Sequence, residues 1–159
     1  MRPGKPLVVL KTGRTEAGVK AARSHTASLA GSYDAFRAVC REQGVGVIPY
    51  SSLGSGFLSG KYRPGAALPS TARAAGVQKS YMNDRGFAVL AAIDKAAGKV
   101  GATPAQVALS WLAHRPGITA PIASATSVTQ LKELLGAIEL RLDEETTAEL
   151  DRASAWRES

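Results

Sequence analysis

Lys5-Pro-Leu-Val-Val-Leu-Lys11 is a short apolar run that Thr12-Gly13 closes. The runs Val45-Gly-Val-Ile-Pro-Tyr50 and Ile118-Thr-Ala-Pro-Ile-Ala-Ser124 repeat this pattern further along the chain. Apolar runs of this length are typical of parallel strands that are buried on both faces. Segments with helical spacing lie between and after them, and such alternation predicts the α/β class. We therefore expect a small parallel sheet of about three strands with flanking helices.

Helix signals separate these strands. Gly44 follows the first helical segment at the position where a C-terminal glycine belongs. Thr103-Pro-Ala-Gln106 and Ser127-Val-Thr-Gln130 each match a capping box, and Asp143 can cap the last helix. The segment 51–83 is rich in Gly, Pro and Ser and predicts a long loop. The expected helices cover about 26–43, 84–100, 103–112, 127–135 and 143–154.

Composition indicates a globular protein of ordinary domain size. The chain has 159 residues, of which 45% are hydrophobic and 21% charged. It shows neither an apolar stretch of membrane-spanning length nor a basic leader followed by an apolar segment, so we expect no membrane partner and a cytoplasmic location. The single cysteine, Cys40, excludes an internal disulfide and favours a reducing compartment. His25 and His114 stand far apart in the sequence without paired ligands, so no metal site is expected.

Charge is distributed unevenly along the chain. The formal net charge is +7, with +9 over residues 1–79 and −2 over residues 80–159. This asymmetry fits either a solvated basic surface or an anion-binding half. The basic residues are scattered and do not alternate with aromatic residues, so we expect no nucleic-acid partner.

The first part of the chain resembles a family of ligases. Lys5 to Gly18, followed by Ser24-His-Thr-Ala-Ser-Leu-Ala-Gly31, resembles the NDP-forming acyl-CoA synthetases, which are relatives of succinyl-CoA synthetase. The resemblance covers residues 1–44 and implies one βα segment of a flavodoxin-like ligase domain. It implies that His25 corresponds to the histidine that is phosphorylated in that family. Ala27 stands where the family pattern has glycine, which weakens the match beside the phosphate.

Residues 45–159 resemble another family, the aldo-keto reductases. Three segments carry this resemblance: 47–62, with Pro-Tyr-Ser-Ser-Leu-Gly-Ser-Gly at its centre, 101–112 and 121–131. The resemblance implies the last two βα units, with strands seven and eight, of a (β/α)₈ TIM barrel that binds NADPH. Thr126 stands where a cation often lies in the family, which should weaken selectivity for the 2′-phosphate. The implied cofactor contacts are Tyr50 on the nicotinamide ring, Ser51, Leu53 and Ser55 along the pyrophosphate, and Ser124, Thr126 and Gln130 at the adenosine 2′-phosphate.

Together the two resemblances predict a chimera, engineered or selected, with 1–44 and 45–159 joined in one compact domain of residues 1–159. The catalytic Asp, Tyr, Lys and His of the reductases belong to strands one to four, which the matching segments do not include. We therefore expect no self-sufficient catalytic activity and no bound cofactor. The alternatives are an NADP(H)-binding oxidoreductase module and a phosphohistidine-carrying ligase remnant centred on His25.

A sheet of three parallel strands is too small to close into a barrel, which takes about eight strands. Two strand edges would remain with unpaired N–H and C=O groups, and such edges pair readily with another chain. We therefore expect a homo-oligomer, most simply a dimer. Flanking helices or the segment 51–82 are an alternative cover for these edges within one chain.

Overall fold

The computed structural model describes residues 7–10 and 40–155 of the chain. The expected helix over 26–43 lies outside the described residues except for its last turn, 40–42, and His25 lies outside them as well. The chain divides into two compact units, one formed by Met1–Ser51 with Arg115–Ile122 and the other by Ser52–His114 with Ala123–Ser159. Each unit is described by itself below.

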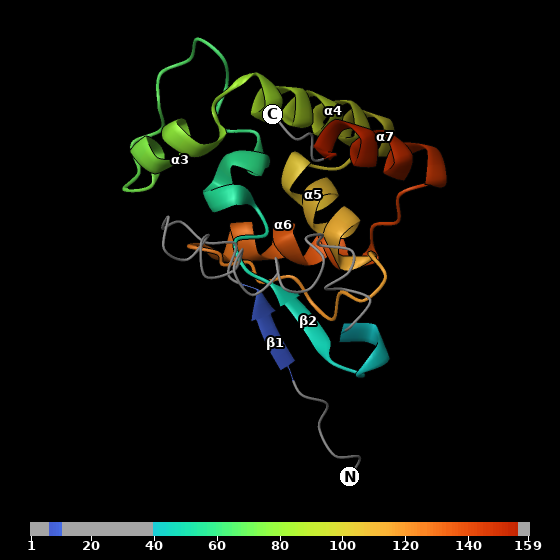
Figure 1. Ribbon diagram of the computed structural model, residues 1–159. Helices are drawn as coiled ribbons and strands as arrows, with labels where there is room; N and C mark the ends of the chain where they lie inside the picture. The colour runs from blue at the N-terminus through green and yellow to red at the C-terminus, as the bar shows by residue number, and fades with distance from the viewer. Residues whose placement is uncertain (1–6, 11–39, 156–159) are drawn as a thin grey trace. The chain divides into compact units, whose positions relative to one another are not determined.

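The first unit contains two short parallel strands, β1 (Leu7–Leu10) and β2 (Gly46–Pro49). Leu7 pairs with Gly46 and Leu10 with Pro49, and Figure 1 shows the two arrows side by side. A helical turn precedes β2 and ends at Gly44, whose φ is 62°. The Gly44 N–H donates to the Arg41 carbonyl at 3.1 Å, so the predicted C-terminal glycine is confirmed.

The expected third strand over 118–123 is wrong. In the described residues this segment forms one isolated parallel bridge, with Val47 as the partner. The Thr119 N–H donates to the Val47 carbonyl at 2.8 Å. Continuing the ladder would require N–H groups from Pro49 and Pro121, and proline has none. The described sheet therefore has two strands instead of three, and the described protein is mainly helical.

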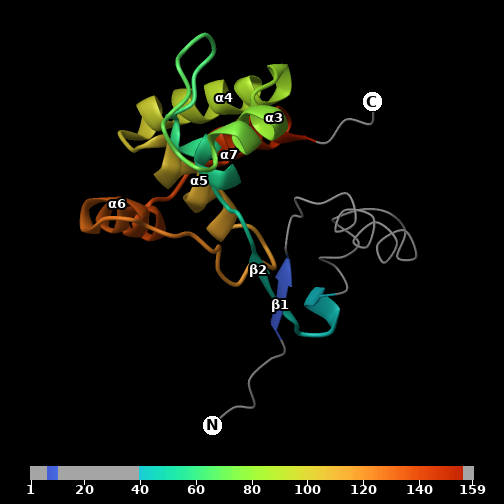
Figure 2. The ribbon, with the colours of Figure 1, turned by 90° about the vertical axis from the view of Figure 1, so that its left-hand side faces the viewer.

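The second unit is helical. It contains the 3₁₀ helix η1 and five α-helices within the described residues, and the α-helices carry the labels of Figure 1. The bounds are η1 (Gly54–Ser59), α3 (Ala74–Tyr81), α4 (Asp84–Val100), α5 (Pro104–Ala113), α6 (Val128–Glu139) and α7 (Glu144–Ser154). Helix α4 packs against α5 and α7, while η1 and α6 also pack on α5. Figure 2 shows α6 along one side of this group.

Local capping explains where the main helices begin. The side chains of Asn83 and Asp143 accept backbone N–H bonds in the first turns of α4 and α7, at 2.9 and 2.7 Å. Thr103 and Gln106 form the predicted reciprocal capping box at the start of α5. The predicted starts of α4, α5 and α7 are confirmed. They were predictable because each depends only on residues within one turn of the helix.

The prediction of a loop throughout 51–83 is wrong, because η1 and α3 lie within it. Aromatic packing organises this segment. Phe57 and Tyr62 are each 1% exposed and form a buried cluster with Val77 and Leu90. The Phe57 ring also stacks on Tyr81, with the ring centroids 5.8 Å apart. These apolar anchors order a segment whose Gly, Pro and Ser content indicates a loop.

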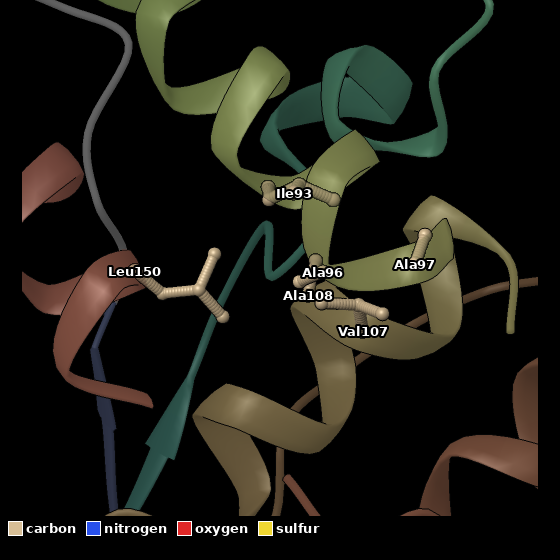
Figure 3. Close-up of a cluster of buried hydrophobic side chains, with 6 residues drawn as sticks. All are labelled: Ile93, Ala96, Ala97, Val107, Ala108 and Leu150. Atoms are coloured by element: carbon tan, nitrogen blue, oxygen red, sulfur yellow. The ribbon is translucent and has the colours of Figure 1, made fainter. Parts of the chain in front are cut away.

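A second buried cluster joins α4, α5 and α7. It contains small or branched side chains, which allow close approach of the helices, and Figure 3 shows them at the crossing. Its members are Ile93, Ala96, Ala97, Val107, Ala108 and Leu150. Among the helices of the described residues, none has the length and apolar character needed to cross a membrane.

Candidate functional site

The cofactor contacts implied by the sequence fall in both units. Tyr50 and Ser51 belong to the first unit. The other candidates belong to the second, where they form two groups: Leu53 and Ser55 beside η1, and Ser124, Thr126 and Gln130 before or within α6. The phosphoryl acceptor candidate His25 lies outside the described residues.

Tyr50 directly follows β2, at the carboxyl end of the strand. Its side chain is 45% exposed, which leaves ring surface accessible to a planar ligand. Ser51 has a φ of 58°, in the left-handed region that residues other than glycine adopt rarely. Such backbone strain is concentrated at ligand-binding turns, so this strand end has the features expected of a cofactor contact.

Three consecutive residues with positive φ form the turn at η1. Gly54, Ser55 and Gly56 have φ values of 55°, 58° and 94°. Glycine adopts this conformation without steric cost, which explains why two of the three positions are glycine. The Leu53 carbonyl closes the turn by accepting the Gly56 N–H at 2.9 Å, while the Leu53 side chain packs against the helical core. Leu53 is therefore held by packing, and Ser55 lies at the centre of the turn.

Lys61 places a positive charge beside this turn. A Cβ atom added at Gly56 would lie 3.2 Å from the Lys61 Nζ, so the ammonium group lies against the glycine backbone. The same Nζ lies 5.6 Å from the centroid of the Tyr62 ring, within the range of a cation–π contact. The position of Lys61 depends on the fold of the turn, and the sequence shows only that a lysine ends this glycine-rich segment. The turn therefore has one positive charge held against its glycine backbone.

The start of α6 forms the second group. The Ser127 side chain accepts the Gln130 N–H at 3.1 Å, which confirms half of the predicted capping box. The Gln130 side chain turns instead to Thr126, whose N–H donates to Oε1 at 2.7 Å and whose hydroxyl donates to the same oxygen at 3.2 Å. This second half of the prediction is wrong because the residue before the cap offers two donors to one acceptor.

Backbone N–H groups at the start of a helix and its positive dipole end favour an anion. Ser124 and Thr126 are exposed at this end of α6, but the Thr126 hydroxyl already donates to the Gln130 Oε1, so the Ser124 hydroxyl is the accessible one. The Gln130 Oε1 accepts both the N–H and the hydroxyl of Thr126, so neither Thr126 donor is free for a phosphate. The start of α6 thus has a helix N-terminus and an exposed serine, without a cation at position 126.

Helix α5 supports both groups, because η1 and α6 each pack on it. Gln106 connects α5 to α6 by donating from Nε2 to the Glu133 carbonyl at 2.9 Å. A Cβ atom on Gly136 would lie 2.4 Å from this amide nitrogen, so a side chain there would displace the Gln106 side chain from its bond to α6. The sequence indicates Gln106 as a capping residue, whereas its second role across the helix pair depends on tertiary structure.

The shifted pKa values of the described residues arise from a helix cap and from ion pairs, and none belongs to a candidate cofactor contact. The pKa of Asp143 is lowered to about 2 by the side chain and the backbone N–H of Thr146 and by Lys99. Lys95 lowers the pKa of Glu149, with 2.7 Å between Nζ and Oε1. The Asp94 carboxylate raises the pKa of Arg63, with which it forms a double hydrogen bond.

Histidine, cysteine and carboxylate side chains do not form a metal-binding group in the part of the chain that the structure describes. His114 ends α5, where its Nδ1 donates to the Ser110 carbonyl at 2.8 Å. Ser110 is itself buried and donates from Oγ to the Leu140 carbonyl at 2.8 Å. His114 therefore has a structural contact at the helix end, and Cys40 is buried in the first unit.

Comparison with known proteins identifies the larger part of the chain. Residues 31–155 match the aldo/keto reductase family. The chain belongs to the aldo-keto reductase family. Probable aldo-keto reductase 1 from Glycine max is 33% identical over 116 residues, which are 72% of this chain and 34% of the relative. The aldo-keto reductase resemblance is thus confirmed, and the chain spans about a third of this curated relative.

The beginning of the chain matches a different family. Residues 1–52 match the succinyl-CoA ligase like flavodoxin domain. Acetate--CoA ligase [ADP-forming] I from Archaeoglobus fulgidus is 61% identical over 41 residues, which are 26% of this chain and 6% of the relative. The ligase resemblance is confirmed as well. This aldo-keto reductase segment therefore carries a ligase-like segment before it, and the two matches overlap over residues 31–52.

Proposed function

We propose that this chain is a chimera of two enzyme fragments, engineered or selected, and that it has no self-sufficient catalytic activity. The observation that carries the proposal is the extent of the matches, which reach 34% of the reductase relative and 6% of the ligase relative. Catalysis requires a complete set of groups held in position together. Fragments of this size supply part of the catalytic groups of a reductase and part of those of a ligase.

Carbonyl reduction needs a proton donor with a tuned pKa beside the hydride carrier. The resemblance places the donor and its partners on strands one to four, whereas β2 and residues 118–123 correspond to strands seven and eight. The described candidates are of another kind: Tyr50 offers an exposed ring, and Ser124 offers an exposed hydroxyl. Groups of this kind support binding and do not by themselves transfer a hydride.

An assay of aldehyde-dependent NADPH oxidation tests this proposal. The purified chain should show no rate above buffer, while the Glycine max relative serves as the positive control. Oxidation that depends on both the aldehyde and this chain, and that Tyr50→Ala abolishes, would show that the fragment is catalytic.

The alternative is a module that binds NADP(H) without turning it over. The capped start of α6, with Ser124 and Thr126 exposed, favours this alternative because helix starts of this form bind phosphate. Binding should still be weak, because the Thr126 N–H and hydroxyl already donate to the Gln130 Oε1 and position 126 carries no cation. The dinucleotide would then be held only by its phosphates.

Fluorescence titration with NADPH distinguishes the chimera without activity from the NADP(H)-binding module. We expect no saturation in the micromolar range. A micromolar dissociation constant that is lost in Ser124→Glu and Gln130→Ala would establish the binding module in place of the first proposal. Gln78→Ala removes an exposed glutamine from α3 and provides the matched control.

A second alternative is a phosphohistidine carrier, which the match of residues 1–52 to a ligase domain favours. Phosphoryl transfer requires nucleotide, metal and acceptor to be held in line. We expect no phosphorylation of His25 by ATP and magnesium. Mass spectrometry of the incubated chain checks this, and an added phosphate that His25→Asn removes would establish the carrier function.

A further inference from the structure

Helix α7 has one apolar anchor on the rest of the second unit. Two of its residues are buried, Thr146 and Leu150, and among the described residues of α7 only Leu150 belongs to a buried apolar cluster. Figure 3 shows this side chain reaching from α7 toward the cluster residues of α4 and α5. Helix α4 by comparison buries four apolar side chains in two clusters. Because the hydrophobic effect grows with the apolar area removed from water, apolar contact holds α7 more weakly than α4.

Acidic side chains of α7 and its cap bind two lysines of α4. The Lys99 Nζ lies 3.1 Å from the Asp143 Oδ2 and 2.8 Å from the Glu145 Oε2. Lys95, one turn earlier on α4, places its Nζ 2.7 Å from the Glu149 Oε1. We name these three contacts the α4–α7 ion pairs. They make the attachment of α7 to α4 depend on charge.

Further polar bonds hold the second half of α7. The Trp111 Nε1 on α5 donates to the Asp151 Oδ1 at 2.8 Å. Arg85, in the first turn of α4, donates to the carbonyls of Ser154 and Ala155 at 3.2 and 3.3 Å. Polar links therefore extend from the cap of α7 to its last turn. Since they are distributed over the whole helix, α7 attaches and detaches as one element.

The α4–α7 ion pairs are open to solvent. The side chains of Lys95 and Lys99 are 69% and 44% exposed. A cleft of about 250 Å³ lies between the two helices, and both lysines line it together with Glu145 and Glu149. Dissolved ions therefore reach the pairs. The screening length falls from about 10 Å at 0.1 M salt to about 3 Å at 1 M, so added salt weakens the attraction between these charges.

We propose that α7 is a salt-released latch, which leaves α4 at high ionic strength while the rest of the second unit stays folded. Apolar packing holds that rest together, because the cluster of Phe57, Tyr62, Val77 and Leu90 contains no residue of α7. A segment held by few buried apolar contacts opens locally before the whole protein unfolds. Release uncovers the part of α4 that Leu150 covers, together with the ammonium groups of both lysines. Ionic strength thereby controls access to this face of α4.

Hydrogen exchange of the full chain, followed by mass spectrometry at low salt and at about 1 M NaCl, tests the latch. Amide exchange in α7 should rise about tenfold, because each of three exposed ion pairs contributes roughly a factor of two to the closed state. Helix α6 is the internal control, since the Gln106 amide and the Glu133 carbonyl that join it to α5 are uncharged. Exchange in α4, α5 and α6 should change by less than about twofold, because screening acts on charges.

Lys99→Met separates the latch from other effects of salt. It keeps the length of the side chain and removes two of the three ion pairs. Exchange in α7 should then be faster already at low salt, and its response to salt should fall to about twofold. Lys79→Met, at an exposed position of α3, is the matched control and should behave as the unmodified chain. Circular dichroism verifies that both variants retain the fold.

Three results would overturn the proposal. The first is exchange in α7 that salt does not change. The second is equal acceleration in every helix, because the whole unit then opens together. The third is a full salt response in Lys99→Met, which would assign the effect to charges within α7 instead of the α4–α7 ion pairs.

Discussion

Helices α4 and α6 are both amphipathic and both pack on α5, but they differ in what covers their apolar side chains. Helix α4 buries Leu90, Ile93, Ala96 and Ala97 in two clusters. Helix α6 buries Ala137 and leaves four larger side chains exposed. An apolar pattern thus identifies the face of a helix that favours burial, while the cover for that face depends on the rest of the assembled protein.

Truncating one isoleucine in each helix gives the largest expected difference. Ile93 is 3% exposed and Ile138 is 63% exposed. Ile93→Ala should lower the free energy of unfolding by about 2–4 kcal/mol, because it leaves a cavity in the core. Ile138→Ala should change it by less than about 0.5 kcal/mol in the dilute monomer. Urea denaturation measures both losses, and equal losses would show that Ile138 is already covered within one chain.

Two glycines of α4 sharpen the comparison within one helix. A Cβ atom on Gly86 would collide with the Tyr81 carbonyl oxygen, whereas a Cβ atom on Gly98 would meet open space. Gly86→Ala should therefore destabilise the protein by about 1–3 kcal/mol through overpacking. Gly98→Ala should stabilise it by about 0.5–1 kcal/mol, because alanine favours the helical conformation. Thermal unfolding checks the opposite signs, and two changes of the same sign would contradict the close packing at Gly86.

The helix caps provide a smaller test. Thr103 forms a complete capping box with Gln106 at α5, whereas the Ser127 cap at α6 lacks the return bond from Gln130. Thr103→Ala should cost about 1 kcal/mol of unfolding free energy. Ser127→Ala should cost less, because α6 contributes less buried surface to the fold. Chemical denaturation of both variants measures which loss of unfolding free energy is larger. A larger loss in Ser127→Ala would show that α6 is the better anchored helix.

Acid should weaken α7 through Asp143. The pKa of this carboxyl is lowered from 3.8 to about 2. Its charged form therefore stabilises the folded state fully above pH 3.8, and this contribution is lost as the pH falls from 3.8 to about 2. Asp143→Asn retains a capping side chain without the charge, so its urea midpoint should fall less over this pH range. If Asp143→Asn loses as much stability in acid as the unmodified chain, the loss arises from other carboxylates, of which Glu149 is the natural candidate.

Local features of the fold were predictable from the sequence, because their causes lie within one helical turn. Asn83, Thr103 and Asp143 each begin the expected helix. The absence of the third strand was not predicted. Ladder hydrogen bonds depend on both partners at once, and Pro49 and Pro121 remove two donors from the same pairing. The prolines were visible in the sequence, but the apolar runs around them favoured a strand.

The candidate site was predictable only as a set of residues. Resemblance to the reductases named Tyr50, Ser55 and Gln130, but the spacing of the sequence did not predict their conformations. The left-handed turn at Ser55 forms because Phe57 and Tyr62 anchor the segment in the core. The bond from Thr126 to Gln130 replaces the expected return bond to Ser127, because Thr126 offers two donors to the same oxygen.

Hydride transfer is the most direct test of whether this fragment acts as a reductase. The full chain, at a concentration well above that of the cofactor, is incubated with deuterium-labelled NADPH and an aldehyde, and the alcohol is analysed by mass spectrometry. The proposal that the chain joins two incomplete enzyme fragments predicts no deuterated alcohol above the buffer control. Deuterated alcohol in amounts equal to the NADPH supplied would show that this chain completes a reductase active site by itself.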